Sequence, residues 1–215
     1  PYTFYGMMHQ FYVVSEKQLD IFFAIFNFNA NKLVMIVISF ASAMATAAIP
    51  LLSGAYARGD KKDMAQQIAN ILQLFLIVML PAALGMAAVA KPLYTLFYGY
   101  DALGTRVLIL SSYSAIFLGL FTALAAILQG LYQNGKAMGY LMVGIVIKFA
   151  IQYPMIALFN VYGPTIATTI GMLVTCWLMI DSLYRNFHFK LEQTARRALA
   201  LLGFSMVMFV VAFEI

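Results

Sequence analysis

A single lysine, Lys148, stands near the middle of a long apolar run. It lies about twelve residues from both Lys136 and Asn160, which in a helix is roughly 18 Å from either end, near the middle of a bilayer. A lysine side chain is too short to carry its ammonium group from there to the interface. An uncompensated ammonium at that depth costs at least about 2.5–3.5 kcal/mol. We therefore expect water, a partner carboxylate or an anionic substrate beside Lys148.

Polar residues recur on the same face of this run at a spacing of four: Tyr140, Gly144, Lys148 and Gln152. Residues four apart share one side of a helix, so they predict a polar stripe. Asp and Glu are absent from this run, 137–159, and from the apolar runs 32–56, 68–90 and 106–130. The stripe therefore indicates a cavity-facing lysine that attracts anions, with Tyr140 and Gln152 beside it. The other interpretation is a structural lysine held by backbone carbonyls.

Three prolines fall inside apolar runs. Pro50, Pro81 and Pro154 each remove a backbone hydrogen bond and predict a helix kink. Such kinks either shape the bundle passively or break helices around a central site, as in secondary transporters. Threonines of a further run are expected to bond carbonyl groups of their own helix: Thr165, Thr168, Thr169 and Thr175.

The elements that must hold these residues are apolar. The chain is 64% hydrophobic and 10% charged, whereas soluble domains average roughly 45–50% and 25%. A spanning helix needs about 20 mostly apolar residues, and six runs come close: 32–56, 68–90, 106–130, 137–159, 163–184 and 198–215. These runs are too long to be β-barrel strands, and they lack the alternation of apolar and polar residues that such strands show. The sequence predicts an all-α, polytopic bundle of about six membrane-spanning helices, a single transmembrane lobe over 1–215.

Basic residues favour every second connection between these runs. They concentrate in 57–66, 131–136 and 185–197, which the positive-inside rule places in the cytoplasm. The 91–105 and 160–162 loops are then external, although Lys91 and Arg106 depart from the pattern. The chain starts at Pro1 and is still apolar at Ile215, so we expect a fragment of a longer polytopic protein.

Several kinds of site are not predicted. The single cysteine, Cys176, and the distant His9 and His188 indicate no metal or catalytic cluster. A glycine-rich phosphate loop is absent, so we expect no nucleotide and no cofactor. Basic and aromatic residues alternate over 184–190, which contact with anionic membrane lipids explains without nucleic acid.

Four segments carry a resemblance to a known family: 31–37, 48–52, 92–99 and 163–171. Over about Phe22 to Arg185 the chain resembles one half of the MurJ-like flippases, in the polysaccharide-biosynthesis branch of the multidrug/oligosaccharidyl-lipid/polysaccharide exporter superfamily. The similarity is greatest to the Gram-positive stage V sporulation protein B group.

The resemblance implies two helical lobes around a central cavity in a bacterial plasma membrane, with this chain as much of the second lobe and the first lobe as its partner. Family members flip undecaprenyl-pyrophosphate-linked sugars, such as the peptidoglycan precursor lipid II, by alternating access. Their basic cavity residues meet the pyrophosphate. The resemblance assigns this role to Lys148, with Lys32 near the external mouth.

Two other functions remain as alternatives. A cation-coupled multidrug exporter of the same superfamily would carry acidic residues in its cavity. A membrane-embedded cell-wall enzyme would need a cluster of carboxylates or histidines in a loop. The absence of carboxylates from four apolar runs favours the lipid-linked oligosaccharide flippase, a transporter and not an enzyme.

Overall fold

A computed structural model describes residues 17, 20–21, 24–159 and 162–188. Its elements are all helical: η1 (Ile25–Ala30), a π-helical turn, then α3 (Asn31–Ala57), α4 (Lys61–Ala88), α5 (Ala90–Tyr98), α6 (Ala102–Gly130), α7 (Asn134–Phe159) and α8 (Gly163–Phe187). Five of these are long and apolar enough to cross a membrane, the first counted from Phe28. The predicted all-α polytopic bundle is thereby confirmed. The sixth apolar run, 198–215, lies outside the described residues.

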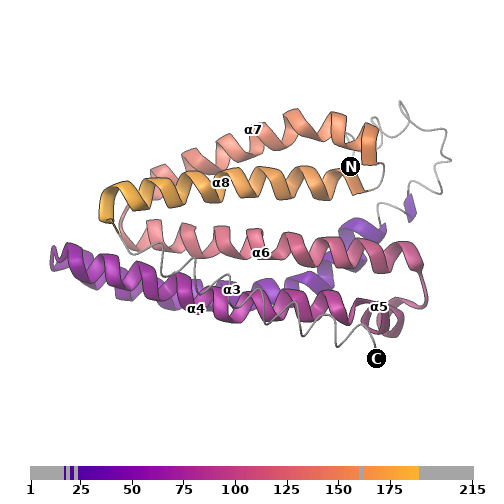
Figure 1. Cartoon of the computed structure of the whole chain (residues 1–215), viewed down its shortest axis with the longest axis horizontal. Coiled ribbons are helices and arrows are strands. Elements are labelled where there is room, and N and C mark those ends of the chain that lie inside the picture. Colours follow the sequence, from indigo (N-terminus) through magenta and orange to yellow (C-terminus); the bar gives the residue numbers. More distant parts are fainter. Residues whose placement is uncertain (1–16, 18–19, 22–23, 160–161, 189–215) are drawn as a thin grey trace.

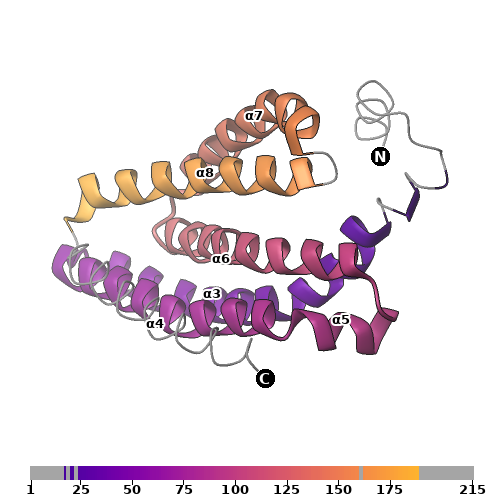
Figure 2. The same ribbon diagram turned by 45° about the vertical axis from the view of Figure 1, so that its right-hand side comes forward.

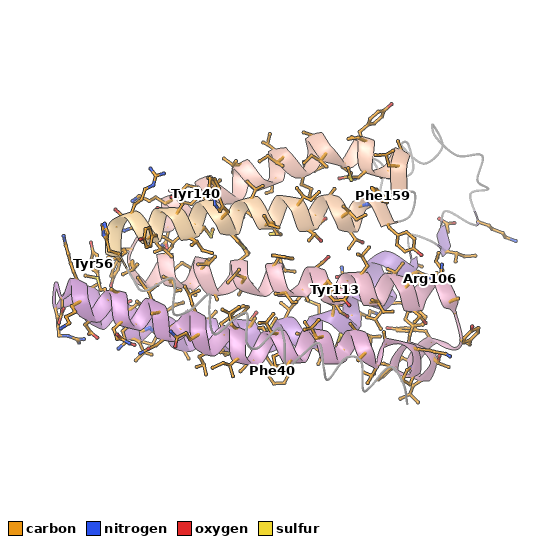
Figure 3. All side chains as sticks on the ribbon, in the orientation of Figure 1. Phe40, Tyr56, Arg106, Tyr113, Tyr140 and Phe159 are labelled. Carbon is orange, nitrogen blue, oxygen red and sulfur yellow. The ribbon has the colours of Figure 1, made fainter. Side chains whose placement is uncertain are left out.

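Helix α6 is the centre of the bundle. It packs against α3 and α4 on one side and against α8 on the other, while α7 packs mainly along α8. Figures 1 and 2 both show α6 between the α3–α4 pair and the α7–α8 pair. The side-chain view places Tyr56 toward one end of the bundle and Arg106 toward the other (Figure 3). Successive long helices therefore run in opposite directions, as short connections require.

Apolar side chains from five helices fill the interior of the bundle toward the α3–α4 turn. The largest cluster includes Leu52, Ile68, Leu124, Ile127 and Met179, all fully buried. A lipid solvent gives no hydrophobic drive between helices, so close van der Waals packing must hold them together. The outward faces stay apolar, as a bilayer requires.

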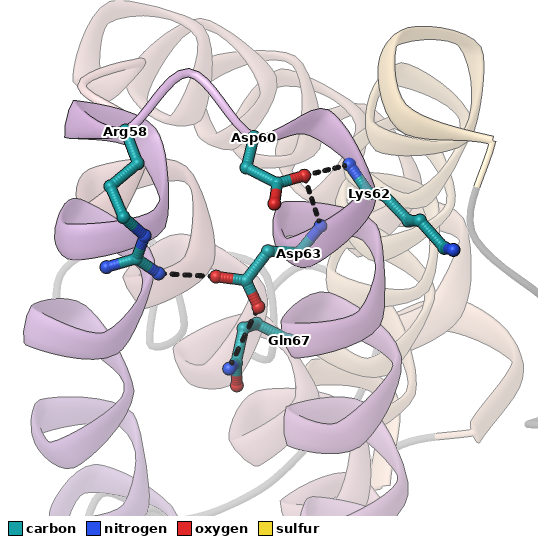
Figure 4. A network of polar contacts seen from close by, with 5 residues as sticks. All are labelled: Arg58, Asp60, Lys62, Asp63 and Gln67. Atoms are coloured by element: carbon teal, nitrogen blue, oxygen red, sulfur yellow. Dashed lines mark hydrogen bonds and ion pairs between the residues drawn. The ribbon is translucent and has the colours of Figure 1, made fainter.

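Polar side chains fix the turn between α3 and α4 (Figure 4). Asp60 caps α4, because its carboxylate accepts hydrogen bonds from the backbone N–H groups of Lys62 and Asp63 at 3.0 Å. Arg58 pairs with the Asp63 carboxylate, which also accepts a hydrogen bond from Gln67. Because of this charged first turn, α4 begins at Lys61, seven residues before the apolar run that predicted it.

Part of the expected loop 91–105 is the short helix α5. Its inward residues are Ala90 and Tyr94, one helical turn apart and both buried. The Tyr94 ring fills the space beside Gly104, where an added Cβ atom would come within 2.2 Å of it. Asp101 caps the following helix by accepting a hydrogen bond from Leu103 N–H at 2.9 Å. A nine-residue helix is too short for a hydropathy pattern to reveal it.

The three prolines lie inside helices, as the sequence analysis expected. Pro50 is in α3, Pro81 in α4 and Pro154 in α7. The kinks themselves stay a prediction. Pro164 occupies the first turn of α8, where its missing N–H group costs no hydrogen bond.

Candidate functional site

A cavity of about 260 Å³ lies between α3, α6, α7 and α8. Its walls combine one ammonium group, one amide, five hydroxyls and apolar side chains: Asn31, Val34, Met35, Ser111, Ser114, Ala115, Leu118, Lys148, Thr165, Thr168, Thr169 and Met172. Because α3 and α8 contribute residues from their first turns onward, the cavity occupies the half of the bundle where these two helices begin.

Lys148 lines this cavity from the middle of α7. It follows the first residue of α7 by about 21 Å and precedes the last by about 17 Å, at 1.5 Å per residue. Its side chain is half-buried. Of the described residues that line the cavity, Lys148 alone carries a charge, and no described carboxylate forms an ion pair with it. Its positive charge is therefore available to a ligand.

Hydroxyl groups from α6 and α8 form part of the cavity wall. Thr168 and Thr169 each donate a hydrogen bond of 2.8 Å to a carbonyl one turn earlier in α8, as expected for threonines in apolar helices. Thr175 does the same at 2.9 Å. The Ser114 and Thr169 hydroxyls are hydrogen-bonded to each other, which joins α6 to α8 at the cavity.

Thr165 departs from this pattern. Its side chain is 4% exposed, and its hydroxyl oxygen has no hydrogen-bond partner in the described part of the chain. A buried polar group without a partner costs about 1–3 kcal/mol, and water or a ligand normally satisfies it. Because Thr165 lines the cavity, water or a polar ligand there can supply the missing partner.

The α7–α8 crossing fixes the position of Lys148. Gly144 and Gly171 bring the two backbones so close that a Cβ atom on Gly171 would lie 3.0 Å from the Lys148 Cβ atom. A crevice of about 20 Å³, enough for one water molecule, runs beside the two glycines. Lys148 and Met172 line both this crevice and the larger cavity.

The other predicted site residues do not line the larger cavity. Gln152 is buried at 6% exposure, and Tyr140 packs against the central apolar cluster. Lys32 is exposed on the first turn of α3, where its neighbour Asn31 lines the cavity instead. The roles assigned to these three residues stay predictions.

The cavity residues from α6 were not expected from the sequence. Ser111 and Ser114 come from α6, which packs against both α3 and α8. Serines inside an apolar run are expected to bond carbonyl groups of their own helix, and the Leu110 carbonyl does lie 3.2 Å from the Ser114 hydroxyl oxygen, as an alternative acceptor to Thr169. Only the packing of α6 in the bundle shows that they face a cavity.

This arrangement suits an anionic group. The Lys148 ammonium and the Thr165 hydroxyl, which has no partner in the described part of the chain, can donate hydrogen bonds to oxyanions, and an anion offsets the desolvation of the lysine. Met35, Leu118 and Met172 add an apolar wall that suits the non-polar part of an amphiphile. Among the residues that the structure describes, no three His, Cys, Asp or Glu side chains come together as a metal site would require.

The fold and the cavity define a class of protein, an integral membrane bundle of spanning helices with an internal polar cavity. Residues 28–154 match the MatE family, and the chain belongs to this family. It is a multi-pass protein of the plasma membrane.

Two similar proteins indicate the branch of the family to which the chain is related. The chain is 32% identical over 189 residues to the lipid II flippase MurJ of Bacillus subtilis (strain 168). The matched region covers 86% of this chain and 35% of that protein. The chain is 26% identical over 129 residues to the uncharacterized membrane protein YabM of the same organism, covering 60% of this chain and 24% of YabM. This chain thus spans about a third or less of each relative. The predicted MurJ-like resemblance is confirmed.

A solved structure shares the fold. The lipid II flippase MurJ in an inward closed conformation superposes with a TM-score of 0.68 at 15% identity. The match covers 85% of this chain and 40% of the solved chain. The bundle thus has the fold of one part of that solved structure.

Proposed function

We propose that this chain is one lobe of a flippase that moves a lipid-linked oligosaccharide across the plasma membrane by alternating access. The observation that carries the proposal is Lys148, a half-buried cation at mid-helix that lines a hydroxyl-rich cavity. A charge held at that depth needs a compensating ligand, and a pyrophosphate group would provide it.

The substrate follows from the relatives. One relative is named for lipid II, so we propose lipid II or a related undecaprenyl-pyrophosphate sugar as the cargo. Lys148 would meet the pyrophosphate, and the Thr165 hydroxyl would meet a further oxygen of the head group. The rest of the transporter, a first lobe outside this chain, would complete the cavity.

A cation-coupled multidrug exporter is the second candidate, because the MatE match is compatible with it. Such an exporter needs carboxylates where organic cations or sodium bind. The described cavity residues include a lysine and no carboxylate, which favours an anionic cargo. Transport, not catalysis, is the activity that we propose.

The test is the appearance of lipid II at the outer surface of cells depleted of their own flippase. The protein that contains this chain is expressed, and lipid II is detected with a membrane-impermeant reagent. We expect the intact protein to restore the signal and Lys148→Ala to lose it. Lys136→Ala is the matched control, because Lys136 belongs to the same helix but is exposed in its first turn.

Two results would contradict the proposal. Export of a cationic dye by a normally inserted protein that does not expose lipid II would favour the multidrug exporter. Equal transport of lipid II by Lys148→Ala and Lys136→Ala would remove Lys148 from the mechanism.

A further inference from the structure

Helix α5 lies across the end of the bundle, between two spanning helices. It is joined to the end of α4 at Ala88 and to the start of α6 at Ala102. Figure 1 views α5 nearly end-on, while α4 and α6 run along the long axis. In a bilayer crossed by α4 and α6, α5 therefore lies close to parallel with the membrane surface, at its edge.

The inward side of α5 is firmly attached. Tyr94 is almost fully buried, and its hydroxyl accepts a hydrogen bond of 3.1 Å from the Asn29 amide. Burial raises the pKa of the Tyr94 phenol above its usual value, so the anchor stays neutral. Because Tyr94 also packs against Gly104, the opposite side of α5 faces outward in a fixed direction.

That outward side is apolar and aromatic. Leu96 is 79% exposed and Phe97 59%, and Tyr100, two residues beyond the end of α5, is 75% exposed. Phe97 and Tyr98 contact each other, with ring centroids 6.4 Å apart. Apolar residues exposed on a spanning helix face lipid tails, but α5 lies outside the spans. Tyr and Trp side chains concentrate at the level of lipid head groups, because their rings are apolar and their polar tips can hydrogen-bond to water.

The charge of α5 has one sign. Lys91 is exposed, and the helix contains no acidic residue. An open groove of about 480 Å³ runs beside it and is lined by Lys91, Pro92, Thr95, Leu96 and Tyr100. A cation at one edge of a mostly apolar groove complements a lipid, whose phosphate is anionic and whose acyl chains are apolar.

We propose that α5 is a membrane-surface helix bound by lipid head groups. Leu96 and Phe97 insert at the boundary between head groups and acyl chains, Tyr98 and Tyr100 lie at head-group level, and Lys91 pairs with lipid phosphates. The helix thereby fixes the depth of the α4 and α6 ends in one leaflet. This inference is independent of the transported substrate.

The test measures the depth of a spin label on α5. A nitroxide is attached at Phe97→Cys in the whole protein, in a background with Cys176→Ala and without other cysteines. The protein is reconstituted in vesicles of phosphatidylcholine, with or without phosphatidylglycerol. Relaxation by oxygen, which collects in lipid, is compared with relaxation by a water-soluble nickel chelate. Leu74→Cys, exposed in the middle of α4, and Gly135→Cys, in the first turn of α7, are the controls.

We expect the label at Phe97 to favour oxygen and to lie about 5–10 Å below the phosphates, shallower than at Leu74. A nickel-chelate response equal to that at Gly135 would mean a water-exposed helix and would overturn the proposal. A label shielded from both reagents would mean that another part of the protein covers α5, and would overturn it too.

Lys91→Glu tests the phosphate contact. With this change we expect the label at Phe97 to become shallower, and more so in vesicles that contain phosphatidylglycerol. An unchanged depth in both kinds of vesicle would remove Lys91 from the contact.

Discussion

Gly144 on α7 and Gly171 on α8 face each other where the two helices cross. A Cβ atom added to either glycine would lie 2.8 Å from the carbonyl oxygen of the other. Lys148 follows Gly144 by one helical turn, and its Cα and Cβ atoms lie beside Gly171. Close approach through small residues is the usual means of joining helices in lipid. The crossing therefore sets the position of the one charged residue in the cavity wall described above.

Gly171→Ala should separate α7 from α8, because backbone and Lys148 atoms occupy the space that the new methyl group needs. Overpacking of this kind costs about 1–3 kcal/mol. We expect a lower unfolding temperature in detergent, together with reduced transport. Gly139→Ala on α7 is the control, since nothing lies within 4 Å of an added Cβ atom there. Equal unfolding temperatures for the two variants would show that the crossing tolerates a wider spacing.

Thr165→Val should leave stability unchanged or slightly higher while it lowers transport. The substitution keeps the shape and removes a buried hydroxyl that has no partner in the described part of the chain. Thr122→Val is the control, because Thr122 donates to the Leu118 carbonyl in its own helix and is not a cavity-lining residue. Unfolding temperature and lipid II exposure are both measured. A clear loss of stability with normal transport would make Thr165 structural.

Much of the fold and one part of the site were predictable. Long apolar runs identify spanning helices because lipid demands them, and Lys148 was noticeable because a mid-run charge is costly. The cavity wall from α6 was not predictable, since Ser111 and Ser114 resemble self-bonded hydroxyls until tertiary packing is known. The sequence also did not show that Asn31, and not Lys32, lines the cavity. Adjacent residues of a helix point about 100° apart, so only one of the two can face it.

The short helix α5 shows the same limit at the membrane surface. Hydropathy windows detect segments of about 20 residues, and α5 has nine. Its amphipathic character depends on the burial of Ala90 and on the packing of Tyr94 against Gly104, which the sequence alone does not reveal. The local hydropathy pattern therefore located the spanning helices. The short helix α5 and the cavity depend on contacts between residues that are distant in the sequence.

The predicted orientation can be tested with thiols at opposite ends of the bundle. Lys62→Cys, at the start of α4, should react with an impermeant reagent only from the cytoplasmic side. Tyr100→Cys, after α5, should react only from outside. Both residues are exposed in the structure, and Cys176→Ala provides the background in both cases. Intact cells are compared with inverted membrane vesicles. Reaction of the two thiols from the same side would contradict a membrane-spanning α4, and the reverse pattern would contradict the predicted orientation.

The field of Lys148 should make the cavity selective for anionic reagents. Met172→Cys, in a Cys176→Ala background, places a thiol in the wall that Lys148 shares. We expect a negatively charged methanethiosulfonate to react faster than a positively charged one. An attraction of about 1 kcal/mol corresponds to a rate ratio of roughly five. Adding Lys148→Gln should abolish the preference without blocking the reaction, because the cavity remains and only the charge is lost. The same ratio with and without Lys148 would mean that its ammonium does not act on the cavity.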